Sequence, residues 1–231
     1  MPASDLPFTP DEYQQRLHKT RSAMAELDLD ALFVTDPSNQ AWLTGYDGWS
    51  FYVHQCLVIG TDGELFWFGR GIDANGAKLT TDLVDSAIIS YPDHYVQSPE
   101  IHPMEYLSGI LKKRNLHSKK IGLEKDNYYF SARAAESLYA SLPDVTFSDN
   151  TALVNWLRAV KSDQEIEYIA TAGKIITNVY DHIMKVVTPE MQKNELAAEI
   201  SHSAISGING KYGDYTSIVP LLGLREEAAA S

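Results

Sequence analysis

The order of apolar segments along the chain limits residues 1–150 to one broad class of fold. Short apolar runs, which favour strands, alternate with segments that carry helical periodicity or helix-start signals. The strand-like runs are residues 31–35, 50–60, 64–70, 86–91, 119–124 and 145–149. Because helices separate most of these strands, the pattern predicts an α/β layered domain with a mixed sheet.

Two of these runs form an expected hairpin. "SFYVHQCLVIG" and "ELFWFGR" are joined by "TDG", a turn sequence between two apolar, aromatic segments. In this interpretation the first segment is one strand, and alternation places Tyr52 and His54 on the same face. Phe51, Val53 and Cys56 are expected mainly in strand and core positions.

The pattern becomes nearly all-helical after the last of these strands. Ser162 and Glu165 have the spacing of a capping box, and they predict a long helix that ends near Val187. A second helix and one strand, "YTSIVPLL", follow. One strand without a pairing partner is not a stable sheet. We therefore expect an α/β domain over residues 1–160 and, over residues 161–231, the start of an α+β domain that these residues do not complete.

The charge balance argues against two classes of partner. The chain has 19 Lys and Arg against 31 Asp and Glu, a formal net charge of −12. Such a chain repels duplex nucleic acid and anionic membrane surfaces. Its first residues lack the basic and apolar regions of a signal peptide, and no apolar run is long enough to span a bilayer. We expect a cytoplasmic protein that binds neither nucleic acid nor membrane.

Short catalytic and metal-binding motifs are absent from the sequence. It contains no phosphate-binding loop, dinucleotide fingerprint, HExxH zinc motif or nucleophile elbow. Its seven histidines show no ligand spacing, so we expect no metal and no cofactor. Cys56 is the only cysteine, which excludes an intrachain disulfide, and a lone cysteine in an apolar run is more often a core residue than a nucleophile.

One stretch carries more chemistry than a plain core strand needs. "LTGYDGWSFYVHQC", residues 43–56, places four aromatic residues beside two glycines, an acid and a histidine. Aromatic side chains pack well in a core, but they also enclose small cations through cation–π contact. The stretch is therefore either a core element or part of a ligand surface.

Several segments resemble the creatinase/prolidase family. "DALFVTDPSNQAWLTGYDGWSFYVHQCLVI" followed by "LFWFGRGIDANGA" resembles the amino-terminal domain of that family. "LRAVKSDQEIEYIATAGKI" resembles the segment that joins its two domains, and "GDYTSIVPLL" the first strand of its catalytic half. The likeness covers residues 8 to 222. Within the family, "TGYDGWSFYVHQ" and "GRGIDANGA" most resemble members that hydrolyse the cyclic amidine ectoine.

The resemblance implies a creatinase-like mixed-sheet domain followed by the start of a "pita-bread" catalytic domain, in a homodimer. One subunit's amino-terminal domain would reach the other's active site. The implied activity is hydrolysis of a C–N bond in a small molecule, with ectoine opened to an N-acetylated diaminobutyrate. The family's catalytic histidine and metal ligands lie beyond the strand that "YTSIVPLL" resembles. No catalytic residue can be assigned here, and we expect a truncated chain that is inactive alone.

The same resemblance implies that the amino-terminal domain contributes to a substrate pocket. The candidate substrate-binding residues are Tyr46, Trp49, Tyr52, His54 and Arg70. Alternatives stay open. In one alternative the chain is a non-catalytic module that binds a small molecule or dimerises. In a second, its full-length relative is an Xaa-Pro peptidase or a creatinase. In a third, the aromatic residues all belong to the core.

Overall fold

The structure is a computed structural model that describes residues 6–48, 50–213 and 220–223. The chain divides into two compact units, Met1–Val160 and Lys161–Ser231. Trp49 and most of the expected strand "YTSIVPLL" lie outside the described residues. No helix in the described ranges is both long and apolar enough to cross a membrane.

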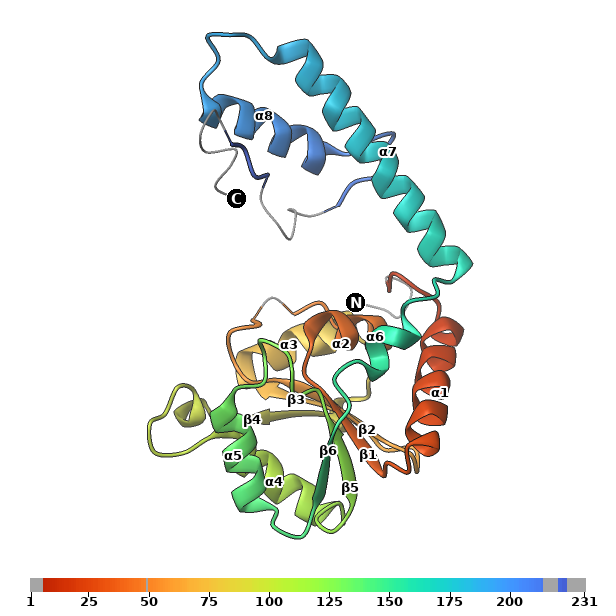
Figure 1. Ribbon diagram of the computed structural model, residues 1–231, viewed down its shortest axis with the longest axis vertical. Helices are drawn as coiled ribbons and strands as arrows, with labels where there is room; N and C mark the ends of the chain where they lie inside the picture. The colour runs from red at the N-terminus through yellow and green to blue at the C-terminus, as the bar shows by residue number, and fades with distance from the viewer. Residues whose placement is uncertain (1–5, 49, 214–219, 224–231) are drawn as a thin grey trace. The chain divides into compact units, whose positions relative to one another are not determined.

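The first unit is built on one six-stranded sheet with the order β4-β3-β2-β1-β5-β6 (Figure 1). Its strands are β1 (Ala31–Val34), β2 (Cys56–Gly60), β3 (Leu65–Arg70), β4 (Ile88–Tyr91), β5 (Lys120–Leu123) and β6 (Thr146–Asp149). The pairs β1–β2 and β2–β3 are antiparallel, and the remaining neighbours are parallel. The predicted mixed sheet is confirmed, and so is the hairpin of β2 and β3.

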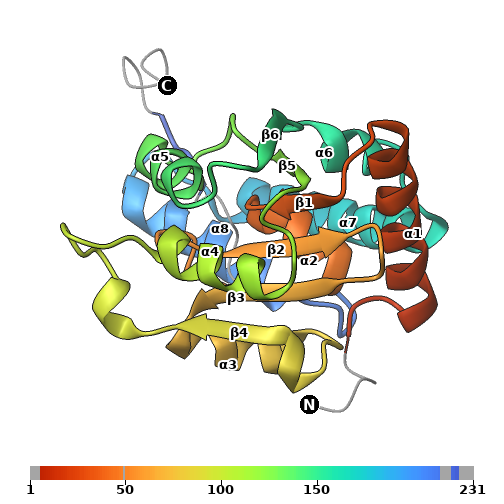
Figure 2. The same cartoon turned by 90° about the horizontal axis from the view of Figure 1, so that it is seen from below.

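Helices cover both faces of this sheet, which gives two hydrophobic cores. The helices are α1 (Pro10–Glu26), α2 (Pro37–Thr44), α3 (Gly71–Thr80), α4 (Pro103–Lys113), α5 (Ala132–Ser141) and α6 (Leu153–Leu157). Helices α4 and α5 pack on one face, while α1, α2, α3 and α6 pack on the other. Figure 2 shows α4 in front of the strands and α3 behind them.

The strand β1, inside the sheet, shows why its run is apolar without interruption. In β1, Ala31 and Phe33 belong to the core under α4 and α5, whereas Leu32 and Val34 belong to the opposite core. All four are fully buried. A strand covered on both faces needs apolar residues at every position, so its sequence loses the alternation of a half-exposed strand.

The expectation that residues 50–60 form one strand is wrong. Strand β2 begins only at Cys56, residues 51–53 form a turn and bend, and His54 is in an irregular segment. The register gives the reason, because Val34 at the end of β1 pairs with Leu57. After that pair β1 leaves the sheet, so the residues that precede Cys56 have no backbone partner on the side where β1 pairs with β2.

The side chains of this turn follow its backbone. Phe51 is 50% exposed, so its predicted core position is wrong, whereas Val53 and Cys56 are buried as expected. Burial raises the pKa of the Cys56 thiol, and Glu124 adds to the effect. A fully buried thiol with a raised pKa is a core group rather than a nucleophile.

A buried carboxylate joins the ends of β1 and β5 to α2. Glu124, 1% exposed, accepts hydrogen bonds from the backbone N–H of Thr35 at 2.6 Å and of Asp36 at 2.8 Å. Its other oxygen accepts from the Asn39 side chain at 2.6 Å, and Asn39 also donates to Asn155 of α6 at 2.8 Å. The carboxylate thus fixes the start of α2, the helix that leads into the turn.

The second unit contains the helices α7 (Asp163–Val186) and α8 (Lys193–Ser206), which pack against each other. The capping box of Ser162 and Glu165 is present, so the predicted long helix is confirmed. His182 contacts Glu199 across the two helices at 2.7 Å. Much of the apolar surface of α7 is exposed: Ile166, Ile169, Ile176, Met184 and the flanking Val187.

Candidate functional site

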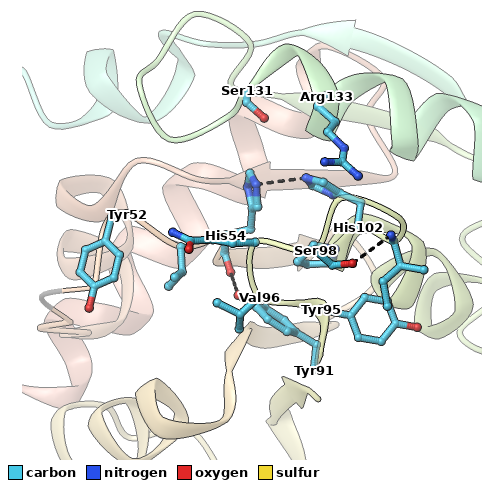
Figure 3. Close-up of a pocket in the computed structure, with 13 residues that line it drawn as sticks. Tyr52, His54, Tyr91, Tyr95, Val96, Ser98, His102, Ser131 and Arg133 are labelled. Atoms are coloured by element: carbon cyan, nitrogen blue, oxygen red, sulfur yellow. Dashed lines mark hydrogen bonds between the residues drawn. The ribbon is translucent and has the colours of Figure 1, made fainter. Parts of the chain in front are cut away.

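A cavity of about 160 Å³ lies beside the irregular segment that precedes β2 (Figure 3). Four parts of the first unit line it: the turn, the end of β4 with the loop that follows, and the starts of α4 and α5. The lining residues are 52–54, Tyr91, 95–98, 101–103, Ser131 and Arg133. The cavity therefore brings together segments that lie far apart in the sequence.

Two histidines meet in the wall of this cavity. The Nε2 atoms of His54 and His102 are 3.1 Å apart. His102 is the N-cap of α4, and its Nδ1 accepts the backbone N–H of Met104 at 3.1 Å. Its own backbone N–H donates to the Glu105 carboxylate at 3.1 Å, which completes a capping box. Helix capping therefore holds the His102 ring in place.

The cap also determines which nitrogens carry protons. Because Nδ1 of His102 accepts a hydrogen bond, a neutral His102 carries its proton on Nε2. That Nε2–H donates to Nε2 of His54, which must be unprotonated, so a neutral His54 carries its proton on Nδ1. Adding a proton to either ring would set two donors against each other at one of these contacts.

The surroundings favour the neutral pair. Burial lowers the pKa of His102 to about 4, with smaller contributions from His54 and from the Arg133 guanidinium. Burial and then Arg133 also lower the pKa of His54. Both effects disfavour the charged imidazolium, as expected for a base that is desolvated beside a cation. At neutral pH the cavity thus presents two uncharged imidazoles and one cation.

Two further hydrogen bonds position the wall of the cavity. The hydroxyl of Tyr91, at the end of β4, donates to the backbone carbonyl of His54 at 3.0 Å. Arg133, in the first turn of α5, donates to the carbonyl of Pro99 at 2.9 Å. The first bond ties the irregular segment to the sheet, and the second holds the guanidinium near the loop after β4.

Of the candidate residues, Tyr52 and His54 line the cavity. Arg70 lies beside Tyr52, with its guanidinium carbon 5.8 Å from the centre of the ring. Arg70 also forms an ion pair with Asp73 at 2.9 Å and donates to the Ser50 hydroxyl at 3.3 Å. The hydrogen bond with Arg70 lowers the pKa of the exposed Tyr52. These residues form a polar cluster next to the cavity.

Tyr46 lies elsewhere. Its side chain is 1% exposed and belongs to the core under α1 and α2, with its ring 5.3 Å from that of Trp67. Its hydroxyl donates to the side chain of Gln55 at 2.7 Å. Tyr46 supports the turn from inside and does not line the cavity.

The sequence-based selection missed His102 and Arg133. A signal for His102 was present, because "HPME" places a proline at the first helical position and a glutamate two residues later, which makes His102 an N-cap. Its contact with His54 spans 48 positions, and no local pattern shows it. Within the described part of the chain, no three His, Cys, Asp or Glu residues group as metal ligands would.

Comparison with known proteins identifies the family. A sequence profile of the Creatinase/Prolidase N-terminal domain matches residues 16–160. Ectoine hydrolase of Halomonas elongata is 51% identical over 231 residues, which cover 97% of this chain and 58% of that protein. An uncharacterized hydrolase/peptidase of Sinorhizobium fredii is 39% identical, over 96% of this chain and 57% of that protein. The chain thus spans about half the length of the curated relatives it matches.

Solved structures agree on the fold. A prolidase from Thermococcus sibiricus superposes with a TM-score of 0.72 at 16% identity, covering 91% of this chain and 53% of that one. An Xaa-Pro dipeptidase from Bacillus anthracis gives a TM-score of 0.65 at 17% identity, covering 83% and 48%. From the profile match over residues 16–160, which is more than half of its length, the chain belongs to the creatinase/prolidase family and carries that family's N-terminal domain.

Proposed function

We propose that this chain belongs to an enzyme of the ectoine hydrolase type, which opens the cyclic amidine ectoine to an N-acetylated diaminobutyrate. The observation that carries the proposal is the 51% identity to ectoine hydrolase over 97% of the chain. The matched region spans the turn and the cavity of the first unit, because it covers 97% of the chain.

The chemistry of the cavity is compatible with such a substrate. Ectoine combines a cationic amidine with a carboxylate. Tyr52 offers an exposed aromatic ring to a cation, while Arg133 offers a guanidinium group to an anion. The neutral histidine pair adds hydrogen-bonding groups without adding a second charge. In this proposal the amino-terminal domain binds and orients the substrate.

The hydrolytic step itself adds water to the amidine carbon and breaks one C–N bond of the ring. We propose that the groups that activate this water belong to the remaining part of the family fold, since the chain spans 58% of the ectoine hydrolase that it resembles. We further propose that the active form is a homodimer, in which the turn around Tyr52 faces the catalytic half of the partner subunit.

A chimaera tests this proposal. The corresponding amino-terminal part of the Halomonas elongata ectoine hydrolase is replaced by residues 1–231 of this chain, which the 51% identity permits. We expect the chimaera to convert ectoine into the acetylated diaminobutyrate, as followed by proton NMR, and the 231-residue chain alone to show no turnover. An Xaa-Pro dipeptide serves as the control substrate and is expected to remain intact.

Two results would count against the proposal. A correctly folded chimaera that cleaves the dipeptide but leaves ectoine intact would favour the Xaa-Pro peptidase alternative. Ectoine opening by the 231-residue chain alone, above a protein-free blank, would show that no further part of the fold is needed.

A further inference from the structure

We propose that the cavity between the turn, β4, α4 and α5 binds the carboxylate group of a small molecule, with Arg133 as its ionic partner and His54 as a hydrogen-bond donor. The inference deepens the proposed function, because it names the group that the cavity recognises. It rests on that function only for the choice of ectoine as the main probe.

The first support is a cation that has no ion-pair partner among the described residues. Arg133 is the one Arg or Lys among the residues that line the cavity, and no Asp or Glu lines it. Among the described residues, no carboxylate lies within ion-pair distance of Arg133. Glu105 and Glu136 line a neighbouring pocket together with Arg133, but neither forms an ion pair with it, and the Glu105 carboxylate accepts the backbone N–H of His102. A guanidinium without a counter-ion on a cavity wall favours an anion, and its planar fork matches a carboxylate.

The histidine pair supplies the second support. The acceptor nitrogens of both neutral rings are occupied, since His102 Nδ1 accepts from Met104 and His54 Nε2 accepts from His102. The proton on His102 Nε2 is used in the same contact. The remaining polar group of the pair is the Nδ1–H of His54, which has no partner among the described residues. A pair that has only a donor left suits an acceptor such as a carboxylate oxygen.

The size and the lining of the cavity restrict the ligand. A volume of about 160 Å³ is below the roughly 300–1,000 Å³ of sites for drug-sized molecules, so it suits a molecule of amino-acid size. Val53, Val96 and Ile101 give the cavity an apolar part in addition to its polar groups. The combination fits a compact ring or chain that bears one carboxylate.

A metal cation fits this cavity less well. The two histidine nitrogens are the only imidazole ligands that line it, and a stable site needs three or four convergent ligands. Arg133 would repel a metal cation, just as it adds to the effect of burial in lowering the pKa of both rings. The electrostatics of the cavity therefore favour an anion.

Calorimetric titration of the 231-residue chain tests the inference with two matched probes. Ectoine carries the carboxylate, and 2-methyl-1,4,5,6-tetrahydropyrimidine is the same ring without it. We expect ectoine to bind at least about tenfold more tightly than the ring alone, because a charge-assisted hydrogen bond contributes that much. The Arg133→Gln variant is expected to weaken ectoine binding by about tenfold to a hundredfold.

Two variants control for charge and folding. Arg133→Lys keeps the charge but loses the fork, so part of the affinity should return. Lys112→Gln removes a positive charge from the exposed end of α4, outside the cavity lining, and should leave binding unchanged. Because Arg133 is exposed, all variants are expected to melt at the temperature of the unaltered chain.

The outcomes separate this inference from the proposed function. If the ring without a carboxylate binds as tightly as ectoine and Arg133→Gln changes nothing, the carboxylate site is refuted while the ectoine proposal stands. If ectoine gives no heat of binding but L-proline binds and the Arg133→Gln variant weakens that binding, the site is supported and ectoine is the wrong ligand. The proposed site is refuted if the titration detects no binding of ectoine, of its ring-opened product or of L-proline at millimolar concentration.

Discussion

Replacing Glu124 with alanine is expected to lower the free energy of unfolding of the chain by about 3–5 kcal/mol. The carboxylate accepts from the backbone N–H groups of Thr35 and Asp36 and from the side chain of Asn39, and it is 1% exposed. Alanine would leave these buried donors without an acceptor, and each unsatisfied buried group costs about 1–3 kcal/mol. Urea denaturation followed by circular dichroism measures the loss.

Two companion variants make this result specific. Glu124→Gln keeps the shape but replaces one acceptor oxygen with a donor, so we expect a smaller loss of about 1–3 kcal/mol. Glu26→Ala removes an exposed carboxylate near the end of α1 and should change the free energy by less than about 0.5 kcal/mol. If Glu124→Ala lowers the free energy of unfolding by less than about 1 kcal/mol, water reaches the site and replaces the carboxylate as the hydrogen-bond acceptor, which contradicts the prediction.

The second large effect concerns His102 and acid. Its pKa in the folded chain is lowered from 6.5 to about 4, mainly by burial. Between these two pH values the unfolded chain binds a proton that the folded chain does not. The contribution of His102 to the free energy of unfolding is therefore complete above pH 6.5 and is lost as the pH drops toward 4. The shift corresponds to about 3 kcal/mol, at 1.36 kcal/mol per pKa unit.

The variant His102→Asn isolates this effect. Asparagine is a good N-cap, so α4 should keep its first turn while the titrating ring is lost. When the pH is lowered from 6.5 to 4, the free energy of unfolding should decrease in both proteins. We expect the decrease to be about 3 kcal/mol smaller in the variant than in the unaltered chain. His117→Asn, at an exposed position, should reproduce the unaltered pH profile. Identical profiles for His102→Asn and the unaltered chain would contradict the lowered pKa.

Glu124 must be considered in the same measurement, because its slope has the opposite sign. Burial raises its pKa from 4.5 to about 7, although its hydrogen bonds act against the change. Between these pH values the folded chain binds a proton that the unfolded chain does not. The contribution of Glu124 to the free energy of unfolding is therefore complete below pH 4.5 and is lost as the pH rises toward 7. The two effects offset each other over much of this range. The profiles of single variants are therefore more informative than that of the unaltered chain.

Much of the fold was accessible from the sequence because it depends on local rules. The strand-like runs marked all six strands, and the central strands β1 and β2, which are covered on both faces, are apolar along their length. Gly45 ends α2 with a φ of 81°, a conformation that suits glycine, so the position of this glycine in the sequence is a local signal for the end of the helix. The family resemblance, carried by short motifs over most of the chain, is confirmed by the profile match.

The candidate site was accessible only in part. Tyr52 and His54 do line a cavity, and they were selected because the family resemblance implies a substrate pocket in this domain and this stretch is rich in polar and aromatic groups. The same reasoning selected Tyr46, which the structure places in the core. Aromatic character alone does not distinguish a buried ring that supports a turn from an exposed ring that faces a ligand.

The sequence by itself determined the strands, the helices, their caps and the family, because propensity, periodicity and capping act over a few residues. Only the tertiary structure decided where β2 begins, since that depends on where its neighbour β1 leaves the sheet. It also decided that the stretch around His54 meets His102 and Arg133. Contacts between residues 48 or more positions apart depend on how the layers pack, and no local pattern encodes that packing.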